Sequence, residues 1–267
     1  MVKSPLRYPG GKSKALGYIM PHVPLNIKEF REPFVGGGSV FLSVENLFHK
    51  RIKLYWINDL SYDLYCFWAY AKDDIETLVE SILEFKNNYP DGRELYNYFT
   101  RKDSLRNEFD RAVRFFVMNR ITFSGVVDSG GYSQQAFEKR FTYSSIERLK
   151  NISFSMSSVQ ITQGDYEKLL FQDGQNVFIF LDPPYWKATK SKLYGVKGDL
   201  HTSFDHARFA TNMRKCNHKW LITYDDSPEI RNLFNFAHIV EWEFQYGMNN
   251  YKQSYAAKGK ELFIKNY

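Results

Sequence analysis

The sequence has little cysteine and no long hydrophobic run, and each shortage excludes a class of protein. Only Cys66 and Cys216 occur among 267 residues, far apart and without a CxxC pair or a histidine at ligand spacing. Neither a disulfide framework nor a zinc site is therefore predicted. No apolar stretch approaches the roughly 20 residues that span a bilayer, and the N-terminus lacks the apolar core of a secretory signal. We expect a soluble, cytoplasmic protein that has neither a metal ion nor a membrane partner.

Acidic residues are also outnumbered by basic ones. Lysine and arginine total 36 against 30 aspartates and glutamates, which gives a formal net charge of +6, and aromatic residues make up 18% of the chain. This balance suits a protein that contacts phosphate and stacks nucleobases on rings. Many basic proteins never meet nucleic acid, however, so composition alone leaves the partner open. The chain is long enough to bury one large core.

Strand and helix patterns alternate at both ends of the chain. The strand patterns occupy residues 27–34, 52–59, 158–166, 176–185, 219–226, 238–246 and 261–267. Helix patterns follow most of them, which predicts an α/β fold with a doubly wound, mostly parallel sheet of seven strands. No helix pattern separates the last two strands, so these should pair as a terminal antiparallel hairpin.

The middle of the chain has a different character. From about residue 63 to residue 150 it contains helix patterns rich in Tyr, Phe, Lys and Arg, then a glycine-containing hairpin pattern at residues 124–137. No alternating α/β pattern appears there. We therefore predict one domain formed by residues 1–62 and 157–267, interrupted by an inserted helical and hairpin domain at residues 63–156.

Glycine and acidic residues follow the first strand patterns. Gly36, Gly37 and Gly38 stand in "EPFVGGGS", where missing Cβ atoms let a ligand approach the backbone and the next helix N-terminus. Asp59 ends the second strand at about the 20-residue spacing for accepting the hydroxyl protons of a ribose. Asp165 ends the third strand, where it could accept from an adenine amino group. A flexible turn and helix N-caps are the simpler explanations of these features.

The N-terminal turn "YPGGKS" looks like a phosphate-binding loop but fails that pattern. Leu6 stands where the pattern needs glycine, and no strand precedes the turn. Gly10, Gly11 and Lys12 can still present backbone N–H groups and an ammonium to a small carboxylate. A solvated turn is the simpler explanation of this segment.

The segment "LDPPY" combines an acid, two prolines and a ring at the end of an apolar strand. Pro183 and Pro184 have fixed φ angles and no backbone donors, which leaves carbonyl acceptors pointing in a set direction. With the Tyr185 ring beside them, these acceptors suit the exocyclic amine of a nucleobase. An amine held on the Asp182 carboxylate and the Pro183 carbonyl would direct its lone pair at an electrophile. A strand stop with a solvent-facing Asp is the simpler explanation.

These motifs together resemble one enzyme family. "RYPGGKSK", "REPFVGGGSVF", "IND", "GDY" and "LDPPY", interrupted by helices ending in "FFVMNRITFSG", resemble the Dam-like class of site-specific DNA adenine-N6 methyltransferases. The resemblance covers nearly the whole chain, and "DPPY" is its most specific part. It implies a Rossmann-like catalytic domain, S-adenosylmethionine as methyl donor, double-stranded DNA as substrate, and an inserted target-recognition domain. We expect a monomer or a weak dimer.

The resemblance also implies roles for single positions. The donor would lie against Tyr8, Gly10, Gly11, Lys12, Phe34, Gly36, Gly38, Asp59, Asp165, Tyr166 and Asp182. In this group Asp59 would hold the ribose, and Asp165 and Tyr166 would flank the adenine of the donor, although Phe is usual where this chain has Tyr166. The tetrad Asp182, Pro183, Pro184 and Tyr185 would hold a target adenine turned out of the duplex.

The insertion would contact DNA. Candidates for phosphate or base contacts are Asn119, Arg120, Lys139 and Arg140, with Arg106, Arg111 and Arg114 on the same helical segment. A solvated helix face explains most of them equally well. The hairpin pattern lacks the "NVPFG"-like ending of relatives that read GATC, so the sequence predicts no recognition site.

Three other functions compete. N4-cytosine methylation uses a similar tetrad, although its first position is more often Ser than Asp. C5-cytosine methylation needs a cysteine nucleophile, and neither Cys66 nor Cys216 lies in a Pro-Cys setting at a strand end. A catalytically silent DNA-binding protein of the same fold is the third, and the intact acidic and glycine positions argue against it.

Overall fold

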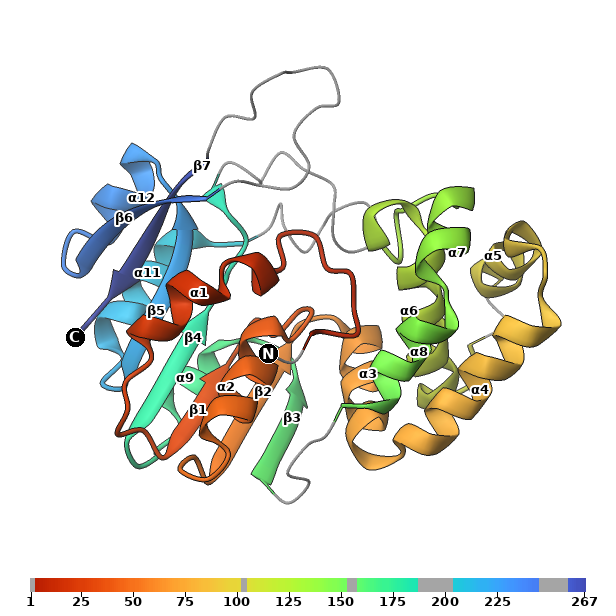
Figure 1. The fold of residues 1–267 in the computed structure, drawn as a ribbon. Coiled ribbons are helices and arrows are strands. Elements are labelled where there is room, and N and C mark those ends of the chain that lie inside the picture. The colour runs from red at the N-terminus through yellow and green to blue at the C-terminus, as the bar shows by residue number, and fades with distance from the viewer. Residues whose placement is uncertain (1–2, 102–104, 153–157, 187–203, 245–258) are drawn as a thin grey trace.

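The computed structural model describes residues 3–101, 105–152, 158–186, 204–244 and 259–267 (Figure 1). At its centre lies a seven-stranded sheet in the order β3-β2-β1-β4-β5-β7-β6. The strands are β1 (Glu29–Glu32), β2 (Leu54–Asp59), β3 (Val159–Gln163), β4 (Val177–Leu181), β5 (Lys219–Asp225), β6 (His238–Phe244) and β7 (Gly259–Lys265). The first five pair in parallel, and β7 pairs antiparallel with β5 and β6. The predicted sheet and its terminal antiparallel hairpin are confirmed.

Both faces of the sheet are buried because its strands alternate apolar side chains between two cores. In β4, Phe178 and Phe180 join one core while Ile179 and Leu181 join the other. The first core is covered by α1 (Leu16–Ile19), η2 (Met20–His22) and α2 (Ser39–Phe48), and η1 (Lys12–Lys14) contacts α1 and α2. The second is covered by α9 (Glu167–Phe171), α11 (His206–Lys215) and α12 (Pro228–Leu233). This layering is that of a doubly wound α/β protein.

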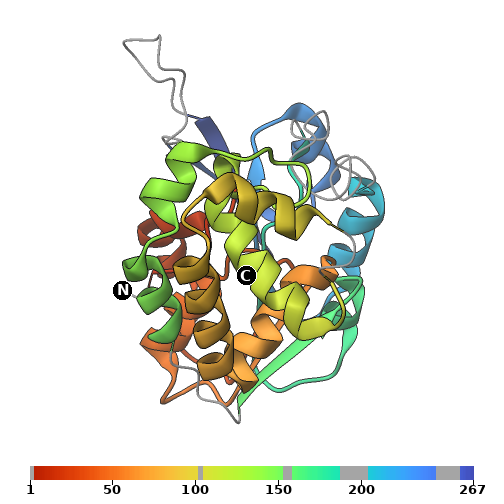
Figure 2. The same ribbon diagram turned by 90° about the vertical axis from the view of Figure 1, so that its right-hand side faces the viewer.

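The chain between β2 and β3 is helical, as predicted. It forms α3 (Tyr62–Asp73), α4 (Ile75–Asn88), α5 (Gly92–Thr100), α6 (Glu108–Ile121), η4 (Phe123–Gly125), α7 (Gln134–Arg140) and α8 (Tyr143–Lys150). Figures 1 and 2 show these helices gathered beyond β3, on one side of the sheet. Ile57 of β2, Phe67 of α3 and Phe116 of α6 belong to one core, so the helices are packed onto the sheet. The division into two domains stays a prediction.

The hairpin predicted at residues 124–137 is wrong. Only one bridge, between Thr122 and Tyr132, joins this segment in the part that the structure describes. Residues from Gln134 onward form α7, because "QQAFEKR" is made largely of good helix formers and the Ser133 side chain caps the Ala136 N–H. Within the described ranges, no helix is long and apolar enough to cross a membrane.

Candidate active site

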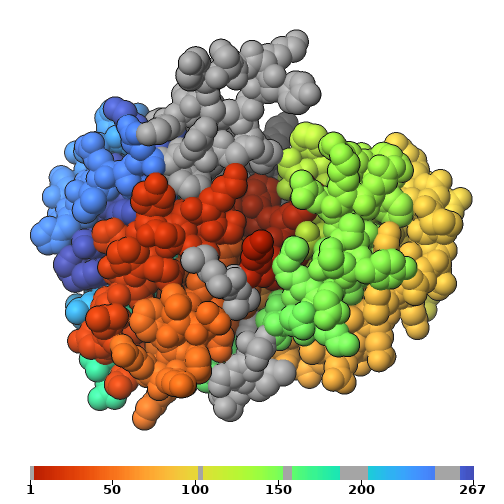
Figure 3. Space-filling view, viewed as in Figure 1, coloured from red at the N-terminus to blue at the C-terminus, as the bar shows by residue number. Residues whose placement is uncertain are grey.

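One pocket of about 420 Å³ lies at the carboxyl ends of the parallel strands. It is lined by every residue that the sequence assigned to the methyl donor or to the "DPPY" tetrad. The strand order reverses between β1 and β4, and the crevice beyond that point is where open α/β sheets bind ligands. In the space-filling view, described residues near the start of the chain (dark red) lie in a hollow beside the green helices (Figure 3).

The glycine turn after β1 lines the pocket, and contacts with other parts of the protein also determine its conformation. Gly36 and Gly38 have φ angles of +46° and +67°, which disfavour any side chain. A Cβ atom on Gly38 would stand 2.6 Å from the Trp68 ring, and the Trp68 indole N–H donates to the Gly36 carbonyl at 3.0 Å. Trp68 comes from α3, so the helical segment holds the turn in shape. No pattern in the sequence indicates this contact.

Asp59 braces the same turn. Its Oδ2 accepts from the Gly36 N–H and its Oδ1 from the Ser61 N–H, both at 3.0 Å. Ser61, whose hydroxyl accepts from Leu64, is the N-cap of α3, so the simpler explanation of Asp59 as a cap is wrong. Burial raises the pKa of Asp59, while the backbone N–H groups oppose that rise.

Asp165 also lines the pocket and is more exposed than Asp59. Its Oδ2 pairs with Arg208 Nη1 at 2.9 Å, and its Oδ1 accepts from the Glu167 N–H at 2.9 Å. The Arg208 guanidinium lies over the Tyr166 ring, 5.4 Å from its centroid. Arg208 lines the pocket from α11, a position that the sequence did not indicate. The Asp165 carboxylate is therefore already paired with a cation.

The N-terminal turn lines the pocket, so the simpler explanation of a solvated turn is wrong. The Lys12 side chain is only 7% exposed, and its Nζ lies 2.8 Å from Asp182 Oδ1. The same Nζ donates to the Gly10 carbonyl at 3.0 Å and sits 4.9 Å from the centroid of the Tyr185 ring. Thr223 of β5 donates to Asp182 Oδ1 at 2.7 Å. Because both partners reach Oδ1, Oδ2 can accept from a further donor.

Two buried acids at the pocket were missed from the sequence. Glu32 lines the pocket, and its Oε2 has no hydrogen-bond partner among the described residues. Burial raises its pKa well above the usual range, and the charge of Asp182 adds to this rise. Glu261 of β7 accepts from the Tyr185 hydroxyl at 2.9 Å. Glu32 lies within the first strand pattern and Glu261 begins the last one, and the contacts that each acid makes depend on the register of the sheet.

The family follows from a comparison with known sequences. The family model described as D12 class N6 adenine-specific DNA methyltransferase matches residues 8–248. The chain belongs to this family. Type II methyltransferase M.MjaIII of Methanocaldococcus jannaschii is 28% identical to it over 238 residues, which cover 80% of each chain. DNA adenine methylase of Vibrio cholerae (strain El Tor Inaba N16961) is 24% identical over 253 residues, covering 88% of this chain and 85% of the relative.

Membership confirms the predicted activity. The protein is an enzyme that methylates the N6 amine of adenine in DNA. The competing functions, N4-cytosine methylation and a catalytically silent DNA-binding protein, are set aside by the same finding. The "DPPY" acceptors and the strand-end acids of the methyltransferase line one pocket.

Asn119 and Arg120 of the methyltransferase lie inside the protein, contrary to the expectation of a DNA-facing surface. Asn119 is fully buried, accepts from the Arg7 N–H at 2.9 Å, and donates to the carbonyls of Arg7 and Gly125 at 2.7 and 2.9 Å. Arg120 is 3% exposed, and its Nε and Nη2 have no partner among the described residues. Burial, followed by the charges of Arg148, Arg7 and Arg140, lowers the pKa of Arg120 to about 9. Neither side chain reaches the surface in this conformation.

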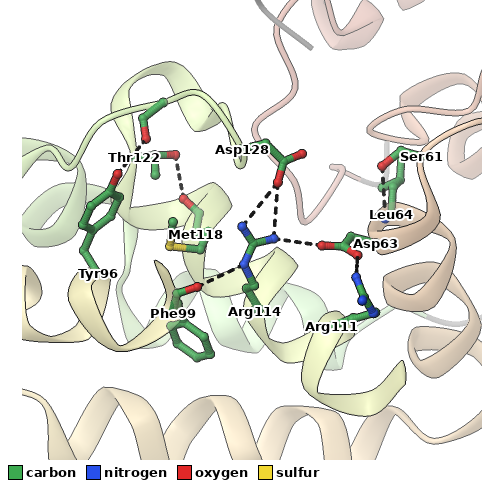
Figure 4. Close-up of polar contacts among 11 residues, drawn as sticks. Ser61, Asp63, Leu64, Tyr96, Phe99, Arg111, Arg114, Met118, Thr122 and Asp128 are labelled. Carbon is green, nitrogen blue, oxygen red and sulfur yellow. Dashed lines mark hydrogen bonds and ion pairs between the residues drawn. The ribbon is translucent and has the colours of Figure 1, made fainter. Parts of the chain in front are cut away.

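Arg111 and Arg114 are engaged with acids. Figure 4 shows both guanidinium groups turned toward Asp63 of α3, with Arg111 at 2.6 Å and Arg114 at 2.8 Å. Arg114 also lies 3.3 Å from Asp128 and donates to the Phe99 carbonyl at 3.2 Å. These two arginines join α6 to its neighbours. Lys139 and Arg140 of α7, by contrast, are exposed.

Proposed function

We propose that this methyltransferase binds S-adenosylmethionine in the pocket and methylates an adenine turned out of double-stranded DNA at a specific sequence. The observation that carries the proposal is the single pocket shared by Asp59, Asp165 and the "DPPY" tetrad. Its volume of about 420 Å³ suits a small nucleoside-containing ligand. The bound donor supplies an electrophilic methyl group on a sulfonium.

The chemistry of the pocket matches the parts of that donor. Asp59 would accept the ribose hydroxyl protons, and the Phe34 and Tyr166 rings, whose centroids are 5.4 Å apart, offer apolar contact for a base. The buried Glu32 has a partnerless carboxyl oxygen that would accept from the ammonium of a methionine group. A nearby cation would return the Glu32 pKa toward its usual range, because it stabilises the charged form.

At the acceptor end, the exocyclic amine of adenine would donate one hydrogen to Asp182 and one to the Pro183 carbonyl. Hydrogen bonds of this kind favour a pyramidal nitrogen whose lone pair is directed at the methyl group. The bond from nitrogen to the methyl carbon would form as the carbon–sulfur bond breaks, which leaves the donor as a neutral thioether. The positively charged amine would then give one proton to the Asp182 carboxylate, which already accepts its hydrogen bond. The Tyr185 ring would stack on the base.

Asp59→Asn should weaken donor binding about tenfold. The change keeps the shape of the side chain but removes its charge, and a hydrogen bond to a charged group contributes about 1.5–3 kcal/mol. Calorimetric titration with S-adenosylmethionine measures this loss, while binding of duplex DNA should remain as in the parent. Asp73→Asn, at the end of α3 and paired with Lys72 outside the pocket, is the matched control. Equal donor affinity in Asp59→Asn and the parent would contradict a ribose contact.

We propose that DNA lies against α7 and the turn of η4. Arg140 is exposed on α7. Burial is the main cause that lowers the pKa values of Arg7 and Arg120, and the charge of Arg140 adds to it, so Arg140 lies near both cations. Phe123 of η4 is 71% exposed, as an apolar side chain that meets a base step would be. Asn119 ties this turn to Arg7, the neighbour of Tyr8 in the pocket. The surface therefore adjoins the site.

Arg140→Gln should lower the slope of log affinity against log salt by about one, because each neutralised phosphate contributes about 0.9 to that slope. Filter binding or anisotropy on one duplex at several salt concentrations measures it. Lys215→Gln is the matched control: Lys215 is exposed at the end of α11, and that helix starts beside the pocket and runs away from it. A slope that falls equally in both variants would show a general charge effect and no local phosphate contact.

Sequencing of methylated positions tests the proposal as a whole. A host without adenine methylation that expresses the chain should acquire N6-methyladenine at one short sequence. Methylation scattered without a motif would contradict site specificity. Relatives bear the name Type II methyltransferase, which supports a role beside a restriction enzyme.

A further inference from the structure

Glu261 is a buried acid beneath the active site that the reaction outlined above does not use. It lies in β7, between Asp225 of β5 and Trp242 of β6 in the register of the sheet, and it is 2% exposed. Burial of a carboxyl group between strands is unfavourable unless its charge or its hydrogen bonds are satisfied. An apolar residue at this position would avoid that cost, so the contacts of Glu261 need an explanation.

The contacts of Glu261 point to the tetrad. Its Oε2 accepts from the Tyr185 hydroxyl at 2.9 Å, while its Oε1 is buried and has no partner among the described residues. Thr223 makes the matching contact from β5, where its hydroxyl donates to Asp182 at 2.7 Å. The antiparallel pair β5 and β7 therefore holds the two side chains of the tetrad that carry hydrogen-bonding groups.

We propose that Glu261 is a positioning residue for methyl transfer, holding Tyr185 by its hydroxyl so that the ring keeps a fixed orientation beside Asp182. The inference rests on the proposed function, in which that ring stacks on the target adenine. A ring anchored at its hydroxyl loses rotational freedom before the base arrives. Less ordering then remains for the moment of binding, which favours the stacked arrangement.

The charges around Glu261 make this anchor dependent on pH. Lys12 of η1 favours its carboxylate, whereas Asp182 and Asp225 disfavour it, and Trp242 on β6 does not titrate. Burial is the largest influence, and the pKa of Glu261 is raised to about 7. The pKa of Tyr185 is raised well above its usual value by burial, so its hydroxyl remains a donor throughout. The bond from the hydroxyl to Glu261 is thus charge-assisted above about pH 7 and weaker below it.

The test compares Glu261→Gln, Tyr185→Phe and the double variant in single-turnover methylation between pH 6 and pH 8.5. In the parent, the rate should fall about three- to tenfold as the pH drops through 7, since the anchor loses its charge. In Glu261→Gln the rate should not fall as the pH drops through 7. This variant should methylate about three- to tenfold more slowly than the parent at pH 8 and bind S-adenosylmethionine with the same affinity. The rate of Tyr185→Phe should also show no fall as the pH drops through 7. The double variant should be no slower than Tyr185→Phe alone.

These readouts separate positioning from a merely structural role. A parental pH profile in Glu261→Gln overturns the proposal, as does a loss that adds in full to that of Tyr185→Phe. If Glu261→Gln does not fold, the pH profile of Tyr185→Phe alone decides the test. A rate that still falls below pH 7 overturns the proposal, and a rate that no longer falls supports it. A parent chain that methylates no adenine would instead count against the proposed function.

Discussion

Asp182→Ala should reduce the single-turnover rate of methyl transfer by about 10²- to 10³-fold, the size of effect seen when one group that stabilises developing charge is removed. The substitution takes away the acceptor that would orient the amine and stabilise the positive charge on it. It also leaves the buried Lys12 ammonium without the carboxylate that lies 2.8 Å away. Incorporation of labelled methyl groups into a duplex carrying the recognition sequence measures the loss.

Asp182→Asn separates the loss of the negative charge of Asp182 from the loss of its hydrogen-bonding oxygen. It keeps an oxygen for the Thr223 hydroxyl but removes the charge that faces Lys12, so we expect a loss nearly as large as in the alanine variant. Asp226→Asn is the matched control, because Asp226 follows the neighbouring strand and pairs with Arg231 outside the pocket. If Asp182→Asn methylates at the parental rate while Asp226→Asn is also unaffected, the tetrad acid has no charge-stabilising role.

The sheet and the composition of the pocket could be predicted because both depend on local patterns and on topology. A run of apolar residues between turn residues predicts each strand, as in Val177–Leu181 ahead of the prolines. Once the strands are parallel, their carboxyl ends meet at one edge of the sheet. Asp59, Asp165 and Asp182 therefore converge even though they are far apart in sequence.

Burial of polar side chains could not be predicted in the same way. Asn119 and Arg120 look like surface residues in sequence because nothing local shows that both side chains are buried, or that Asn119 bonds to the backbone of Arg7, more than a hundred positions away. The role of Glu261 depends on β7 inserting between β5 and β6, which reverses the order of the last two strands. Contacts of this kind arise from packing between residues far apart in the chain, which the local pattern of apolar residues does not predict.

Tyr185→Ala should slow methyl transfer about five- to a hundredfold, because stacking of a base on an aromatic ring contributes about 1–3 kcal/mol. That range is comparable with the few kcal/mol needed to extrude a base from the duplex. Tyr185→Phe keeps the ring but loses the bond to Glu261, so its loss should be smaller, near the three- to tenfold expected for one hydrogen bond. The ring lines the pocket and is only partly buried, so one part of it remains within reach of a base.

A fluorescent adenine analogue at the target position separates stacking from packing. The parent should brighten it on binding, since the base leaves its neighbours in the duplex, and Tyr185→Ala should brighten it less while binding S-adenosylmethionine with nearly parental affinity. Tyr185→Phe should keep most of the signal, because the π face of the ring, and not its hydroxyl, contacts the base. If Tyr185→Ala retains both the fluorescence change and the parental rate, the ring only fills space at the end of β4 and the adenine is held by Asp182 and the Pro183 carbonyl alone.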